Sequence, residues 1–141
     1  MLHLSNNSFN AMERTLPGKA PVSSTYDPRK ATIDALCLAL EEFRRLSPTM
    51  PVAQVQAFLL VALDETVSMT DVAELTGVRP STASRYLLDL GVRRTQLDNA
   101  FGLLERGVDP MNTRRARYSL TRRGTLFVNR LIKACDKAGL V

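Results

Sequence analysis

The sequence predicts a mainly α-helical domain with one small β-hairpin, of the α+β class. Three observations predict it. Several stretches repeat apolar residues at the three- and four-residue spacing of amphipathic helices. Two short helical stretches are joined by a glycine turn between Thr70 and Gly91, and two strand-like runs flank a polar segment between Leu103 and Leu120. A chain of 141 residues, 45% of them hydrophobic, holds one such domain.

Residues 1–28 contain Pro, Gly, Ser and Asn without sustained periodicity, so we expect a flexible arm ahead of a domain over residues 29–141. The first helix should run from Arg29 to Leu46. It carries one apolar stripe, formed by Ile33, Leu36, Cys37, Leu40 and Phe43. A second helix, from Pro51 to about Glu65 with Thr49 as its N-cap, is apolar on almost every side. Such a helix belongs in the middle of the core.

The stretch from Thr70 to Gly91 has the pattern of a helix-turn-helix. Thr70 and Asp71 should start a short helix after an extended link, Val67–Met69. Its buried side is expected to hold Val72, Ala73 and Leu75. Gly77 stands where a left-handed residue is needed to leave the helix, and Val78 is the apolar plug of the turn.

Pro80 and Ser81 open the second helix of the pair, and Ala83, Leu87 and Leu90 should face inward. The opposite face is polar and suits the major groove of DNA. Its residues are Ser81, Thr82, Ser84, Arg85 and Tyr86.

Leu103–Leu104 and Arg117–Leu120 predict two short strands, with a polar tip from Gly107 to Arg115 between them. A hairpin with a basic tip directly after a helix-turn-helix is a wing. Thr121 should then cap a last helix that ends near Ala138. The apolar stripe of that helix consists of Phe127, Leu131, Ala134, Cys135 and Ala138.

Positive charge is concentrated in the second half of the chain. The net charge is +5, but Arg79 to Arg130 contains 11 arginines, no lysine and four acidic residues. That segment therefore carries +7 and the rest of the chain −2. Because the arginine fork suits phosphates and base edges, this concentration favours a nucleic-acid footprint over a generic charged surface.

The residues that catalysis or metal binding needs are scarce. His3 is the one histidine, and Cys37 and Cys135 are far apart and outside any CxxC motif. Adjacent carboxylates such as Glu41 and Glu42 point about 100° apart on a helix and share no site. We therefore expect no enzyme activity, metal site or cofactor. Two free thiols, no long apolar run and no signal peptide indicate a cytoplasmic protein.

The wing and its surroundings resemble the MarR family of dimeric winged-helix DNA-binding regulators. The residues that follow the family pattern are Gly102-Leu103-Leu104-Glu105-Arg106, Asp109-Pro110, Arg114, Leu120-Thr121 and Gly124. The resemblance extends over about Arg29 to Ala138. It implies a winged helix-turn-helix, dimeric through its N- and C-terminal helices, that acts as a transcriptional repressor on an inverted-repeat operator.

Carried over by position, the resemblance assigns Ser81, Thr82, Ser84 and Arg85 to base edges and Arg114 to the minor groove. Asn112 stands where the family has an aspartate that orients this arginine. The segment from Gly91 to Phe101 is longer than the family's link, and its arginines either extend the phosphate footprint or lengthen the second helix. The full set of predicted DNA-binding residues is Arg79, Ser81, Thr82, Ser84, Arg85, Tyr86, Arg93, Arg94, Arg114, Arg115 and Arg117.

Alternation along a strand gives Arg115 and Arg117 one shared exposed face, opposite Tyr118, which suits phosphate contacts.

Two other functions compete with that of a regulator. A winged helix that docks on the transcription machinery would be a protein-interaction adaptor, and a replication initiator would also bind duplex DNA.

Cys37 lies on the helix that carries a reactive cysteine in some relatives, but its place in an apolar stripe favours a structural role. The sequence identifies no small-molecule effector.

Overall fold

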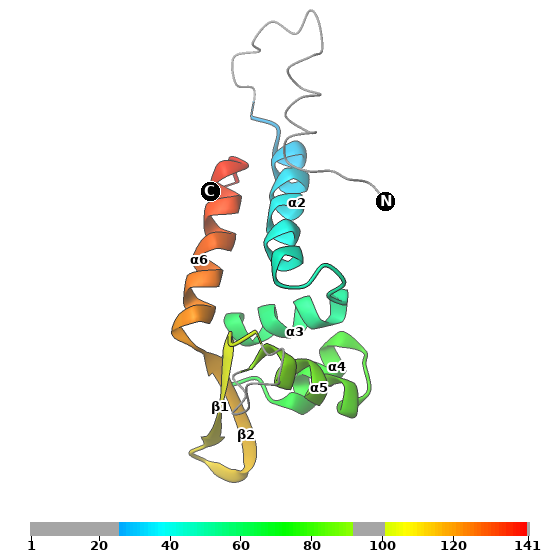
Figure 1. The fold of residues 1–141 in the computed structure, drawn as a ribbon, viewed down its shortest axis with the longest axis vertical. Coiled ribbons are helices and arrows are strands. Elements are labelled where there is room, and N and C mark those ends of the chain that lie inside the picture. Colours follow the sequence, from blue (N-terminus) through cyan, green and yellow to red (C-terminus); the bar gives the residue numbers. More distant parts are fainter. Residues whose placement is uncertain (1–25, 92–100, 141) are drawn as a thin grey trace, which may run out of the picture.

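The computed structural model describes residues 26–91 and 101–140. Its elements follow the order that the sequence predicts. They are α2 (Pro28–Leu46), α3 (Val52–Leu63), α4 (Met69–Thr76), α5 (Pro80–Leu90), β1 (Leu104–Asp109), β2 (Asn112–Leu120) and α6 (Arg122–Lys137) (Figure 1). Most of the predicted arm, residues 1–25, lies outside the described part. Near the end of the predicted arm, Asp27 is the N-cap of α2, and its carboxylate accepts the Arg29 N–H at 3.0 Å.

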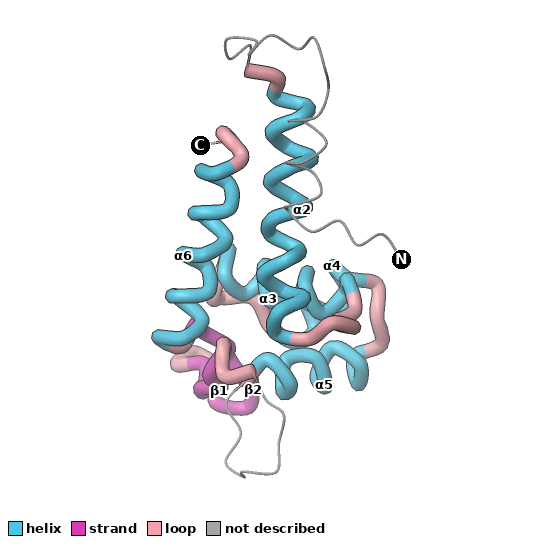
Figure 2. Tube along the Cα trace, turned by 45° about the horizontal axis from the view of Figure 1, so that its top comes forward, coloured by secondary structure: helices cyan, strands magenta, loops and turns pink. Residues whose placement is uncertain are grey.

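The two long helices, α2 and α6, lie side by side and run antiparallel (Figures 1 and 2). The start of α2 and the end of α6 lie together at one end of the molecule (Figure 1). At the other end of the molecule α3, α4, α5 and the hairpin form a compact unit. No helix in the described ranges is both long and apolar enough to cross a membrane.

Three phenylalanine rings join the long helices to this unit. Phe43 of α2, Phe58 of α3 and Phe127 of α6 are all buried. Their ring centroids are 5.0 to 5.9 Å apart, and each pair meets edge to face. This geometry places the positive edge of one ring against the negative face of the next. The junction therefore fixes three helices relative to one another.

The helix-turn-helix packs on α3 as the sequence predicts. Ala83, Leu87 and Leu90 of α5 are completely buried. Gly77 ends α4 in the left-handed region with φ of 73°, a conformation that costs other residues energy. Val78 packs against the core from the turn. The inner face of α5 and the turn glycine are confirmed.

The hairpin is a two-stranded antiparallel sheet with Leu104 opposite Leu120 and Val108 opposite Ala116. The strands extend further than predicted, and Asp109 pairs with Asn112 across a tight turn at Pro110 and Met111. The predicted tip from Gly107 to Arg115 is therefore wrong. Both strands continue almost to the turn through mostly polar, exposed residues, whose composition suggested a turn-rich tip.

Three local predictions are corrected by packing. The stripe of the first helix is divided: Phe43 is buried, whereas Ile33, Leu36 and Leu40 are exposed, and α2 faces the core through Ala31, Ala35 and Leu38 as well. Leu75 of α4 is exposed rather than buried. Thr49 does not cap α3, which begins after Pro51 without a side-chain cap. For the first helix and for Leu75, periodicity identified apolar positions but not the element that covers them.

Gly124 tests how closely α6 approaches the wing. A Cβ at this position would overlap the Leu103 carbonyl oxygen and lie 3.2 Å from Leu120 Cδ2. Gly124→Ala should lower the free energy of unfolding by about 2 kcal/mol, because backbone must shift to admit the methyl group. Urea unfolding measures this.

Gly107→Ala is the matched control. Its Cβ would lie 4.0 Å from the nearest atom, the Arg117 carbonyl oxygen, so stability should change by less than about 0.5 kcal/mol. Equal effects of the two substitutions would contradict the close approach.

Candidate nucleic-acid interface

The second helix of the pair, α5, presents a polar face to solvent. Pro80 occupies its first position, and no acidic residue lies in its first turn. Because Ala83, Leu87 and Leu90 point inward, the polar residues lie on the outer side and flanks of the helix. Arg79, Ser81 and Arg85 are exposed, and Thr82, Ser84 and Tyr86 are half-buried. The unpaired N–H groups and positive dipole end of α5 add an anion-binding character to this surface.

A buried polar contact fixes α5 on α3. Gln54 is 5% exposed, and its side-chain Nε2 donates to the Tyr86 carbonyl oxygen at 3.4 Å. A buried amide without a partner would cost energy, so this contact favours one placement of α5. Sequence reasoning missed Gln54. Gln54 is one of two glutamines, with Gln56, in the otherwise apolar stretch Val52–Leu63, and the local pattern does not show that Gln54 is the buried one.

The first helix of the pair is held by a reciprocal cap. Ser68 Oγ accepts the Asp71 N–H at 3.1 Å, and Asp71 Oδ2 accepts the Ser68 N–H at 3.0 Å. Hydrogen bonding of the Asp71 carboxylate with Ser68, first of all with its backbone N–H, lowers the pKa of Asp71 below its ordinary value of 3.8, and the Arg115 charge makes a smaller contribution. The cap moves the start of the helix to Met69, one residue before the predicted Thr70.

The connection between α3 and α4 is fixed by a second carboxylate. Asp64 Oδ1 accepts the Thr66 N–H at 2.9 Å and the Thr66 hydroxyl at 2.6 Å. These two hydrogen bonds lower the pKa of Asp64. The connection is thus a defined turn rather than a loose link.

The tip of the wing is shaped by two side-chain turns. Asp109 Oδ1 accepts the Met111 N–H at 2.9 Å, and Asn112 Oδ1 accepts the Arg114 N–H at 3.2 Å. Met111 is 93% exposed at the turn itself. Arg114 is exposed on β2, two residues after Asn112, which pairs with Asp109 across the turn. Asn112 therefore orders the backbone of Arg114.

Arg115 and Arg117 share one face of β2, as alternation predicts; Arg115 contacts the first turn of α4, and Arg117 contacts the α3–α4 connection. Arg115 Nη2 lies 3.4 Å from Asp71 Oδ2, and Arg117 Nε donates to the Glu65 carbonyl oxygen at 3.2 Å. Glu65 Oε2 in turn accepts the Leu120 N–H at 2.8 Å. Sequence reasoning missed Glu65 in this role, because its partners are more than 50 residues away.

The long link after α5 lies outside the described residues, and so do Arg93 and Arg94, whose DNA-binding role stays a prediction. Its two ends are described. Gly91 ends α5 in an extended conformation, so the alternative of a lengthened second helix is wrong. The ends meet through hydrogen bonds from the Gly102 N–H to the Gly91 carbonyl at 3.0 Å and from the Leu103 N–H to the Leu90 carbonyl at 2.8 Å. The link thus leaves and rejoins the fold between α5 and the wing.

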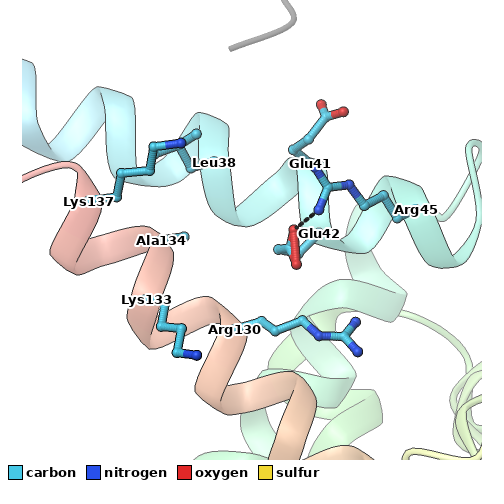
Figure 3. A pocket seen from close by; sticks show the side chains of 8 residues that line it. All are labelled: Leu38, Glu41, Glu42, Arg45, Arg130, Lys133, Ala134 and Lys137. Atoms are coloured by element: carbon cyan, nitrogen blue, oxygen red, sulfur yellow. Dashed lines mark hydrogen bonds and ion pairs between the residues drawn. The ribbon is translucent and has the colours of Figure 1, made fainter.

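A groove of about 240 Å³ lies between α2 and α6, away from the helix-turn-helix. Its walls carry Leu38, Glu41, Glu42, Arg45, Arg130, Lys133, Ala134 and Lys137. Arg45 pairs with Glu42 at 2.7 Å on the α2 side. Figure 3 shows the cationic side chains of α6 pointing in different directions, so they do not converge on one ligand position. Cys37 and Cys135, on the same two helices, are half-buried.

The polar outer face of α5, which we call the recognition surface, and the wing lie at the same end of the molecule (Figure 1). The structure thus brings the predicted residues of α5 and β2 to one end, although Arg115 and Arg117 also bind the protein itself. In the described residues, no three His, Cys, Asp or Glu side chains are grouped to hold a metal ion.

No family model and no curated protein matches the sequence. Solved structures do match the fold. An S. aureus MepR–DNA complex gives a TM-score of 0.59 at 18% identity, covering 79% of this chain and 83% of that one. A MepR mutant bound to an oligodeoxyribonucleotide gives 0.59 at 19% identity, covering 79% and 75%. RV1404 from Mycobacterium tuberculosis gives 0.57 at 18% identity, covering 76% and 67%. These matches and the order of helices and strands confirm the predicted winged-helix fold.

The cap at Ser68 generates a prediction about stability and pH. Ser68→Ala should lower the free energy of unfolding by about 1 kcal/mol at neutral pH, because α4 loses its N-cap. The Asp71 carboxylate stabilises the fold above its ordinary pKa of 3.8, and this stability is lost as the pH falls through its lower folded pKa. The difference between wild type and Ser68→Ala should therefore shrink in acid.

Urea unfolding from pH 7 to pH 3 checks both statements. Thr70→Ala is the control, since Thr70 is an exposed residue on the same helix. A Ser68→Ala effect that is constant with pH would contradict the reciprocal cap.

Proposed function

We propose that this chain is a MarR-type transcriptional regulator that binds double-stranded DNA sequence-specifically as a homodimer in the cytoplasm. One observation carries the proposal: α5 turns a polar face with exposed Ser81 and Arg85 to solvent, at the same end as the wing. Two of the similar solved structures are DNA-bound MepR, which supports DNA as the partner. Within this function, we propose that the chain acts as a repressor and that its operator is an inverted repeat.

Within this proposal, α5 reads bases and its N-terminal end holds phosphate. Ser81, Thr82, Ser84 and Arg85 lie on the first turns of the helix, where side chains reach base edges in the major groove. Arg79 and Tyr86 flank that surface and suit backbone contacts. Arg114 near the wing tip suits a narrow A·T-rich minor groove, where the potential is most negative.

A second copy of the chain accounts for the exposed apolar residues of the long helices. Ile33, Leu36 and Leu40 follow one another along α2, and Leu126 and Ile132 are exposed on α6. Exposed apolar groups that recur on one helix face mark an association surface. A two-fold dimer through these helices would place the two copies of α5 on half-sites about 10 bp apart, or slightly more.

Binding to DNA over a salt series tests the proposal. Selection from a random duplex pool yields the preferred sequence, and the logarithm of its affinity should fall linearly with the logarithm of salt concentration. Absence of duplex binding at low salt would contradict the proposal and favour the adaptor function.

Arg85→Ala should weaken binding to the selected duplex by about 1–3 kcal/mol and relax the preference at one position per half-site, because a bidentate contact to guanine is lost. Arg44→Ala is the control, since Arg44 lies on α2 and pairs with Glu41 at 3.3 Å. Fluorescence anisotropy on the selected and permuted duplexes measures both. A uniform loss on every sequence would assign Arg85 to phosphate instead of a base.

Leu36→Glu should convert the dimer to a monomer and weaken DNA binding with it, because a charge enters an apolar interface. The control is Leu75→Glu, since Leu75 is 63% exposed on α4 and Leu36 is 59% exposed. Sedimentation velocity gives the oligomeric state. A Leu36→Glu protein that remains dimeric with full affinity would overturn this interface.

A further inference from the structure

The connection between α3 and α4 lies along the outer edge of β2. The sheet has two strands, so this edge has no partner strand among the described residues. Glu65 supplies an acceptor there, and its Oε2 binds the Leu120 N–H at 2.8 Å. An edge N–H needs a partner or solvent, and a carboxylate is a strong acceptor for it. The side chain thus ties the base of the wing to the helical unit.

Two further contacts extend this attachment along the same strand. Arg117 Nε donates to the Glu65 carbonyl oxygen at 3.2 Å, and Arg115 Nη2 pairs with Asp71 Oδ2 at 3.4 Å. The three contacts are spread along β2 at Arg115, Arg117 and, through its backbone, Leu120. They reach from the middle of the strand to its end, so they constrain the angle of the wing as well as its position.

The anchoring side is itself rigid. Asp71 is held by the cap with Ser68 at the start of α4, and Glu65 is the middle residue of the turn that Asp64 fixes through Thr66. Because α4 packs on α5, a wing attached to this segment is placed relative to the recognition surface.

We propose that Glu65 and Asp71 are positioning residues that hold the wing at a fixed angle to α5, with Arg115 and Arg117 as their partners rather than as phosphate ligands. This inference rests on the proposed DNA-binding function and deepens it. The attachment lets Arg114 reach the minor groove while Arg85 is in the major groove of the same half-site. The sequence prediction of phosphate contacts for Arg115 and Arg117 is the competing assignment.

The two assignments predict opposite signs at Asp71. If Asp71 positions the wing, Asp71→Asn weakens DNA binding a few-fold. Its amide oxygen still accepts the Ser68 N–H, but the attraction to Arg115 is lost. If Arg115 is a phosphate ligand, Asp71→Asn removes a competing negative charge and strengthens binding. Glu74→Gln is the control, since Glu74 is an exposed carboxylate on the same helix.

Salt dependence separates the arginines. Removal of a phosphate ligand lowers the slope of log affinity against log salt by about one. On a duplex of random sequence, Arg115→Ala should lower affinity with the slope unchanged. The double variant Asp71→Asn/Arg115→Ala should bind no more weakly than either single variant. A slope reduced by about one in Arg115→Ala, or additive losses in the double variant, would overturn the proposal.

Glu65 supplies a readout that does not involve DNA. Glu65→Ala should speed hydrogen exchange of the Leu120 amide about fivefold, the equivalent of one net hydrogen bond, while Glu65→Gln retains an acceptor and restores the wild-type rate. Unchanged exchange in Glu65→Ala would refute the attachment. If the two variants show this exchange pattern but the wild-type protein binds no duplex, the attachment stands and only the proposed function is refuted.

Discussion

The edge-to-face packing of Phe43, Phe58 and Phe127 is the contact on which the rest of the arrangement depends. These rings lie where α2, α3 and α6 meet, and each comes from a different helix. Such pairs contribute about 0.5–1.5 kcal/mol each beyond the burial of their area. Their larger effect is geometric, because the long helices and the helix-turn-helix cannot rotate independently while the rings are interlocked. A dimer formed through α2 and α6 would therefore set the spacing of the two α5 helices.

The wing is placed by contacts at its base rather than by its own sheet. Leu103 donates its N–H to Leu90 at the end of α5, while its carbonyl oxygen accepts the Thr121 N–H at the start of α6. Gly124 lets α6 approach this residue closely. A two-stranded hairpin is marginal alone, so its stability and direction come from α5, α6 and the α3–α4 connection.

Features with local signals could be predicted from the sequence. The inner face of α5, the left-handed Gly77 and the Thr121 cap each depend on a few neighbouring residues, and all three are present. The exposed stripe of α2 could be found by periodicity, but periodicity does not say whether the same chain or another copy covers it. The contacts of Glu65 and Asp71 with β2 join positions 44 to 55 residues apart. Such pairings leave no trace in local pattern, because they follow from the packed fold.

Titration of the isotopically labelled full chain with a selected duplex, followed by amide chemical shifts, tests the central claim that α5 and the wing form the DNA-binding surface. The account predicts that the largest changes occur in Ser81–Tyr86 of α5 and in Met111–Arg114 of the wing. The amides of the middle of α2, around Leu36, should change little. Changes concentrated on α2 and α6, with α5 and the wing unaffected, would contradict the account.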